Sequence, residues 1–107
     1  MYFKITPSTK KTFLIKPLYS SKYFRLYATP NSLKSARLGI QITKKAIRLA
    51  VVRNHIRRKI KEDFRSTYAT LPKLDFLIVI SSKITSEKHQ ISDILMREWK
   101  KSIKSLF

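Results

Sequence analysis

Three things are scarce in this sequence of 107 residues: cysteine is absent, glycine occurs once, and the first 61 residues contain no Asp or Glu. Without cysteine, disulfides and thiolate metal sites are excluded, and the two histidines are too few for an all-histidine metal cage. The single glycine also excludes a glycine-rich phosphate-binding loop. We therefore expect a protein of the reducing cytoplasm with no metal site of its own.

Long apolar runs are missing as well. Lys4, Lys10, Lys11 and Lys16 interrupt the first 20 residues, which leaves neither a signal-peptide core nor the roughly 20 apolar residues of a membrane span. We expect no membrane association. Because 43% of the residues are hydrophobic, the chain has enough material for one core, and residues 1–107 are predicted to form a single domain.

Positive charge dominates what is present. The chain holds 24 Lys and Arg against 6 Asp and Glu, a net charge of +18, and 16 of these cations precede the first carboxylate, Glu62. One Trp, five Tyr and six Phe argue against a disordered basic tail, which would lack the apolar material to fold. This balance predicts a polyanion partner, with nucleic acid favoured over an anionic membrane or an acidic protein.

Three segments have strand patterns. Residues 23–29 and 37–43 alternate with period two across a turn at residues 30–32, and we predict that they form an antiparallel pair. Residues 75–80 (DFLIVI) form a continuous apolar run, which is typical of an interior strand covered on both faces.

Three further segments have helical patterns, and the predicted class is therefore α+β. Thr6-Pro7-Ser8 is typical of a helix start, and Pro17 is expected to end that short first helix. Residues 51–65 form a basic helix between the second and third strands. A closing helix is predicted from Ser86 to Phe107, where apolar residues recur at i+4 spacing.

Alternation gives the first two strands two chemically different faces. The face predicted to enter the core holds Phe24, Leu26, Leu38, Ile40 and Ile42. The opposite face holds Tyr23, Arg25, Tyr27, Arg37, Gln41 and Thr43. Because bases stack on aromatic rings and guanidinium groups hold phosphates, this second face is predicted to bind single-stranded nucleic acid. The alternative is an ordinary solvated sheet face.

The basic helix, VVRNHIRRKIKEDFR, is amphipathic in two senses. On a helical wheel its apolar stripe consists of Val52, Ile56, Ile60 and Phe64. Beside the stripe lies an arc of about 100° formed by Asn54, Arg57, Arg58, Lys61 and Arg65. A solvated helix face usually alternates charge signs, whereas only Glu62 and Asp63 interrupt this one. The arc is therefore predicted to lie along a phosphate backbone.

Two other classes of protein compete with this interpretation. A metal-dependent nuclease gathers several carboxylates around divalent ions, whereas the six acids here are scattered in sequence, so we assign no catalytic residue. A ribosomal-protein-like RNA scaffold or a helix-turn-helix DNA binder accounts for the charge equally well. Competition between folded RNA and duplex DNA at several salt concentrations separates these possibilities.

The segments RLGIQIT and KKAIRLAVVRNHIRRKIKEDFR resemble the signature of the bacterial ribonuclease P protein subunit. The resemblance consists of an Arg-Leu-Gly strand, a Lys-Lys pair and an Arg-Asn helix opening, and its specificity lies in residues 37–65. The matching residues are Arg37, Leu38, Gly39, Lys44, Lys45, Arg53, Asn54, Arg57 and Arg58. The sequence departs from the family at His55, where Arg is usual, and Lys59 is expected to supply the missing cation.

The resemblance implies an accessory subunit. In that family a large RNA uses Mg²⁺ to remove the 5′ leader from precursor tRNA, and one protein per RNA assists it. The implied fold is a compact α-β sandwich, like domain 2 of a small-subunit ribosomal protein, with three helices, about four mostly antiparallel strands and a left-handed connection through the basic helix. The implied RNA contacts are Lys44, Lys45, Arg48, Arg53, Asn54, Arg57, Arg58, Lys61 and Arg65. The implied leader contacts are Phe13, Tyr23, Arg25, Tyr27 and Arg37.

Overall fold

The computed structural model describes Tyr2 and residues 16–31 and 35–106. These residues form one four-stranded sheet, two long helices and a short 3-10 turn. The elements are β1 (Tyr19–Ser20), β2 (Arg25–Pro30), β3 (Arg37–Ile42), α2 (Ala50–Thr67), η1 (Tyr68–Thr70), β4 (Leu74–Ile80) and α3 (Lys88–Leu106). The α+β class is confirmed. The predicted first helix falls almost entirely outside the described residues.

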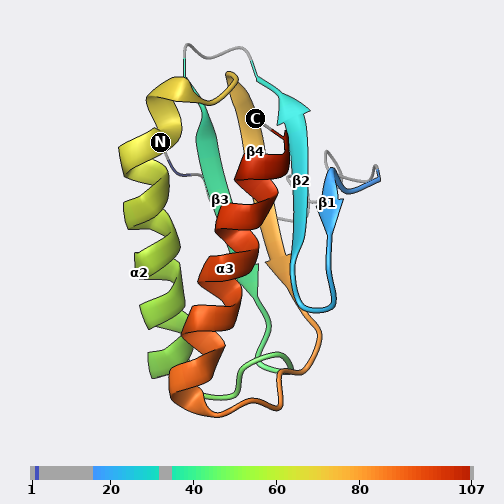
Figure 1. Cartoon of the computed structure of the whole chain (residues 1–107), viewed down its shortest axis with the longest axis vertical. Helices are drawn as coiled ribbons and strands as arrows, with labels where there is room; N and C mark the ends of the chain where they lie inside the picture. The colour runs from blue at the N-terminus through green and yellow to red at the C-terminus, as the bar shows by residue number, and fades with distance from the viewer. Residues whose placement is uncertain (1, 3–15, 32–34, 107) are drawn as a thin grey trace.

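The last strand in sequence, β4, lies inside the sheet, whose order is β1-β2-β4-β3 (Figure 1). It pairs antiparallel with β2 and parallel with β3, with Leu26 and Ile40 both opposite Ile78. The predicted direct pairing of residues 23–29 with 37–43 is therefore wrong. The physical reason is burial, because the continuous apolar run of β4 needs neighbours on both edges and cover on both faces.

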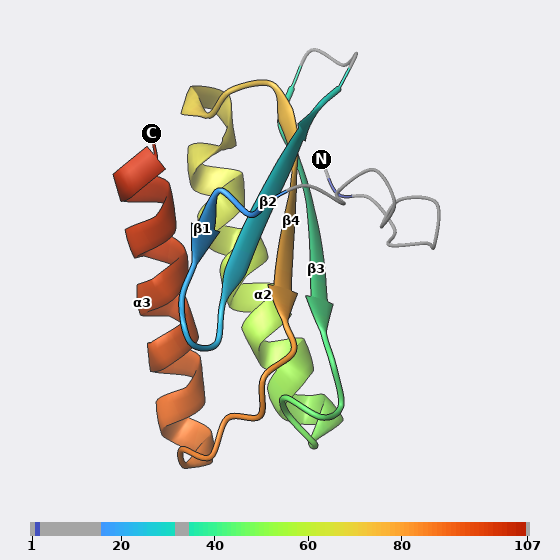
Figure 2. The same cartoon turned by 90° about the vertical axis from the view of Figure 1, so that its right-hand side faces the viewer.

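The connection from β3 through α2 to β4 has an unusual hand. In Figure 1, β3 and β4 both point downward and β4 lies to the right of β3, and Figure 2 shows that α2 packs on the sheet face that is turned toward the viewer in Figure 1. This arrangement is left-handed, whereas such crossovers between parallel strands are right-handed in about 98% of cases. The structure therefore has the handedness that the family resemblance implies.

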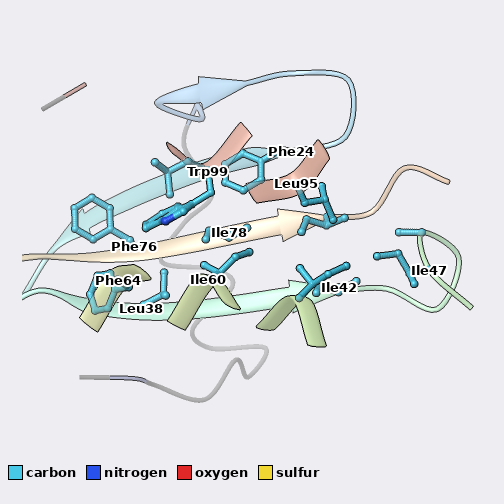
Figure 3. Packing of buried hydrophobic residues seen from close by; sticks show 14 of the residues in the cluster. Phe24, Leu38, Ile42, Ile47, Ile60, Phe64, Phe76, Ile78, Leu95 and Trp99 are labelled. Carbon is cyan, nitrogen blue, oxygen red and sulfur yellow. The ribbon is translucent and has the colours of Figure 1, made fainter. Parts of the chain in front are cut away.

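Both helices pack on the same face of the sheet (Figures 1 and 2). The core between the two layers takes alternate strand residues and the apolar stripes of the helices (Figure 3). Ile56, Ile60 and Phe64 of α2 are fully buried, as the wheel predicted. Leu95 and Trp99 of α3 are also fully buried, which confirms the i+4 pattern of the closing helix.

Two of the six carboxylates tie α3 to the rest of the fold. The indole Nε1 of Trp99 donates a 2.6 Å hydrogen bond to Oδ2 of Asp63 on α2. The Tyr19 hydroxyl of β1 donates a 2.9 Å hydrogen bond to Oε2 of Glu98 on α3. Burial of the ring, and then this bond, raise the pKa of Tyr19 above its ordinary value. Neither helix in the described part of the chain is long and apolar enough to cross a membrane.

Candidate nucleic-acid interface

The predicted cationic arc of α2 forms one continuous surface. Its residues line a shallow depression on the side of the helix that faces away from the core. The lining consists of Asn54, Arg57, Arg58, Lys61, Glu62 and Arg65. All five arc residues are thus brought together, with one carboxylate at the margin. We name this surface the α2 basic face.

Arg57 lies at the centre of the α2 basic face. Its Nη1 donates a 3.1 Å hydrogen bond to Oδ1 of Asn54, which fixes the orientation of the guanidinium group. Partial burial, and then the nearby Arg53 charge, lower the pKa of Arg57 below its ordinary value. The charged form is therefore less favoured here than in open water, and a phosphate placed on this face would relieve that cost.

Arg53 has a different role from its neighbours on α2. Its Nη1 donates hydrogen bonds to the backbone carbonyls of Ile47 and Arg48, at 2.8 and 2.9 Å. These carbonyls belong to the connection between β3 and α2, which also carries Lys44 and Lys45. The structure thus makes Arg53 a residue that positions the basic loop, a role that the spacing of charges does not reveal.

The loop itself presents cations at the lower end of the molecule in Figure 1. Lys44, Lys45 and Arg48 are all exposed. The backbone between them is anchored, because the amides of Ala46 and Ile47 both donate to the carbonyl of Thr43 at 3.1 Å. The loop cations therefore extend from a fixed backbone next to the first turn of α2.

Lys61 is held against an aromatic ring that the sequence analysis did not single out. Its Nζ lies 4.9 Å from the ring centroid of Tyr2, and the Tyr2 hydroxyl donates a 3.1 Å hydrogen bond to the Lys61 carbonyl. Tyr2 also packs on Phe64 and forms an isolated parallel bridge with Leu38. An isolated Tyr has no periodic pattern, so nothing in the sequence marks this contact.

Lys59, which is expected to supply the cation missing at His55, lies one helical turn after it on α2. His55 is exposed on α2. Lys59 also lines a separate groove between α2 and α3, together with Asp63 and Asp93. Because Lys59 follows His55 by four residues, about one helical turn, both side chains project from the same side of α2, and the expectation that Lys59 supplies the missing cation stays a prediction.

The face of the sheet opposite the helices has three cross-strand rows, set by the register. The middle row contains Tyr27, Leu77 and Gly39, and the row nearer the β1–β2 turn contains Arg25, Val79 and Gln41. The predicted shared face of Arg25 and Tyr27 is thus confirmed. Leu77 is 3% exposed and Gly39 is buried, so Tyr27 is the accessible residue of the middle row. We name this surface, which no helix of the described chain covers, the open sheet face.

One predicted leader contact, Tyr23, does not join that surface, and a second, Phe13, cannot be placed on it. Tyr23 precedes β2, packs against the core and has the Lys22 Nζ 5.2 Å from its ring centroid. The prediction that residue 23 belongs to the strand is wrong, because the chain turns there, with the Ser21 amide bonded to the Phe24 carbonyl. Phe13 lies outside the described residues.

Arg37, the remaining leader candidate, is bound within the protein. Its Nε and Nη2 donate to the two carboxylate oxygens of Asp75 at 2.8 and 2.6 Å. The Asn31 amide adds a 2.8 Å bond to Oδ1 of Asp75. Burial alone would raise the pKa of Asp75, but the hydrogen bonds from Arg37 and Asn31 outweigh it, and the net pKa is lowered. The bond to Asp75 in turn raises the pKa of Arg37.

A basic helix face, an anchored basic loop and a sheet face with tyrosine and arginine define a nucleic-acid-binding α+β protein. Comparison with known proteins is consistent with this class. The family model described as Ribonuclease P matches residues 10–106. The ribonuclease P protein component of Psychrobacter sp. is 39% identical over 100 residues, which is 87% of this chain and 77% of that protein.

Two further relatives agree. The ribonuclease P protein component of Idiomarina loihiensis is 32% identical, over 94% of this chain and 82% of that protein. The RNase P protein structure from Staphylococcus aureus superposes with a TM-score of 0.69 at 25% identity and covers 91% of this chain and 92% of that one. The chain belongs to the Ribonuclease P family, as an accessory protein subunit of the ribonucleoprotein endonuclease that processes tRNA.

The Asp75 interactions predict a specific acid dependence. The folded-state pKa of Asp75 lies below its unfolded value of about 3.9, so its stabilisation is present above that pH and is lost as the pH falls through the folded pKa. Asp75→Asn should lower the free energy of unfolding at pH 7 by about 1 to 3 kcal/mol. It should also flatten the loss of stability below pH 4, measured by urea unfolding.

Asp93→Asn is the matched control, because Asp93 is exposed on α3 and its removal should change stability by at most about 0.5 kcal/mol. Equal effects of the two substitutions would show that the Arg37–Asp75 pair does not stabilise the fold.

Proposed function

We propose that this subunit binds the catalytic RNA of ribonuclease P through the α2 basic face and the Lys44–Arg48 loop, and holds the 5′ leader of precursor tRNA on the open sheet face. The RNA carries out the cleavage with Mg²⁺, and one protein serves one RNA. The observation that carries this proposal is the convergence of all five arc residues of α2 in one depression.

Electrostatics support the RNA contact. The net charge is +18, and Arg58 and Arg65 extend from the α2 basic face as exposed guanidinium groups. Each phosphate contact releases condensed counterions, which supplies affinity that does not depend on base sequence. The forked guanidinium geometry adds direction to those contacts, so the face can set the orientation of the protein on a folded RNA.

The loop contributes because Arg53 holds it in place. Two guanidinium hydrogen bonds fix the Ile47 and Arg48 carbonyls, so the exposed loop cations sit at a defined position relative to the helix face. A pre-arranged loop loses less conformational entropy on binding than a free one. Arg53 therefore supports RNA binding through the loop.

The open sheet face supports the leader contact. Arg25 and Tyr27 lie on that face of β2 two residues apart, so a ring for a base stands beside a cation for a phosphate. Leu77 and Gly39, which share the row of Tyr27, are buried, so the proposed contact rests on Arg25 and Tyr27 themselves. In this proposal Arg37 does not contact the leader but orients Asp75 at one end of the face. Tyr23 lies in the β1–β2 turn, at the other end of the face, and helps to shape it.

The carboxylates support an accessory role. Asp63 accepts the Trp99 indole bond, Glu98 accepts the Tyr19 hydroxyl bond, and Asp75 binds Arg37. Half of the six acids thus serve the fold at three separate places, which leaves little with which to assemble a two-metal nuclease site.

Reconstitution tests the proposal as a whole. The catalytic RNA of the same organism, with the protein, should cleave labelled precursor tRNA at lower Mg²⁺ than the RNA alone, because the protein's cations replace part of the divalent screening. The protein without RNA should cleave nothing. Metal-dependent cleavage by RNA-free protein would overturn the proposal.

The α2 basic face predicts a change in salt dependence. Replacing Arg57 and Arg58 together by Ala should weaken binding to the catalytic RNA and reduce the slope of log K against log salt by about 0.7 to 0.9 per lost phosphate contact. Circular dichroism should report an unchanged fold. Lys101→Ala, which removes an exposed cation of α3, is the control and should leave both affinity and slope nearly unchanged. If the two changes had equal effects on affinity and slope, the α2 basic face would not be a specific RNA contact.

The open sheet face predicts a leader-specific effect. Losing the Tyr27 ring should cost about 1 to 3 kcal/mol, or roughly 5- to 150-fold in affinity, for precursor tRNA bound to the assembled enzyme. Mature tRNA, which has no leader, should bind Tyr27→Ala and the parent enzyme alike. The measurement is a pair of titrations with both tRNAs, and an equal loss for the two tRNAs would show that Tyr27 makes no leader contact.

A further inference from the structure

A small apolar pocket lies at the end of the molecule where the β3–α2 and β4–α3 connections meet, at the bottom of Figure 1. Its volume is about 160 Å³, below the roughly 300 to 1,000 Å³ of pockets for drug-sized ligands, which suits a single ring system. The pocket is lined by Lys45, Ala46, Ile47, Arg48, Leu49, Val52, Lys83, Ile84 and Ile91. It is separate from both the α2 basic face and the open sheet face.

The walls of this pocket are held together by backbone hydrogen bonds. The Ile84 amide donates to the Ala46 carbonyl at 3.1 Å, which ties one connection to the other. The Arg53 guanidinium fixes the carbonyls of Ile47 and Arg48 from the other side. The apolar floor is therefore supported by contacts that exist before any ligand arrives, and little entropy is lost when the pocket is filled.

The rim differs chemically from the floor. Ile47, Ile84 and Ile91 are each less than 10% exposed and form an aliphatic floor. Lys45, Arg48 and Lys83 are all exposed, and none of the lining residues is acidic. An apolar hollow ringed by three cations complements the apolar face of a flat ring that is linked through its sugar to a phosphate on each side. An unstacked nucleotide has that composition, and flipped bases are commonly held between apolar side chains.

We propose that this pocket receives one unpaired base of the bound RNA, while Lys45, Arg48 and Lys83 hold the phosphates beside it. The inference rests on the proposed RNA contact of α2 and its loop. The pocket adds specificity to that contact. Phosphate contacts can form anywhere along a duplex, whereas an extruded base occurs at one position of the RNA and so defines where the protein binds.

Binding to two short RNA duplexes tests the pocket. One duplex carries a single bulged adenosine, and the other carries an abasic residue at the same position. The full-length protein should bind the first about 5-fold or more tightly than the second, as measured by fluorescence anisotropy. Equal affinities would overturn the inference and leave the pocket for another occupant, such as an apolar side chain of a protein.

Two variants at the start of α2 locate the effect, Leu49 directly before the helix and Val51 in its first turn. Leu49 lines the pocket and is 46% exposed, whereas Val51 is 80% exposed and does not line it. Leu49→Ala should remove most of the preference for the bulged base, and Val51→Ala should keep it. Loss of the preference in Tyr27→Ala but not in Leu49→Ala would place the base on the sheet face and overturn the inference.

The abasic duplex separates this inference from the proposed function. Its binding depends on phosphate contacts, so the parent protein and Leu49→Ala should bind it equally, with the same salt dependence. If neither duplex binds the parent protein, the proposed RNA contact fails, and the pocket inference fails with it. If both bind equally, only the pocket inference fails.

Discussion

The rest of the structure depends on the double pairing of β4. This strand pairs with β2 on one edge and β3 on the other, and Phe76, Ile78 and Ile80 are completely buried beneath the helices. Its opposite side contributes Leu77 to the open sheet face and Asp75 to the bond with Arg37. Because β4 lies between β2 and β3, Tyr27 of β2 and Gly39 of β3 flank Leu77 of β4 in the middle row. The strand that completes the core thus also sets the spacing of the proposed leader surface.

The position of the helices separates the α2 basic face from the open sheet face. Because α2 and α3 both pack on one face, the other face of the sheet carries no helix of the described chain (Figure 2). The left-handed connection places α2 beside β3, at the edge of the sheet (Figure 1), and the α2 basic face is lined by residues of α2 alone. The two proposed RNA-binding surfaces are therefore parts of one rigid body whose separation is fixed by the core, and leader binding and RNA binding can be aligned without a hinge.

Sequence patterns predicted the local structure of this fold better than its connections. The stripe of α2, the closing helix and the faces of β2 follow from period alone, because each depends on neighbouring residues. The place of β4 between β2 and β3 depends on contacts between distant segments, and adjacency in sequence gave the wrong pairing. For the site, spacing grouped the five arc residues correctly. It had no means to show that Arg37 and Arg53 form internal bonds, since a bound and a free arginine look alike in a sequence.

This division among the arginines has a physical basis. An oxygen of a carboxylate or carbonyl that is turned inward needs a hydrogen-bond donor, and the six acids are too few to neutralise the 24 Lys and Arg side chains. Among the described arginines, Arg37 bonds to Asp75 and Arg53 bonds to the carbonyls before α2, whereas the bond from Arg57 to Asn54 lies within the α2 basic face. A substitution at the first two of these arginines therefore acts first on the shape of the surface, whereas a substitution at Arg58 or Arg65 acts first on its charge. The same signature thus contains both the proposed RNA contacts and the bonds that hold the surface in position.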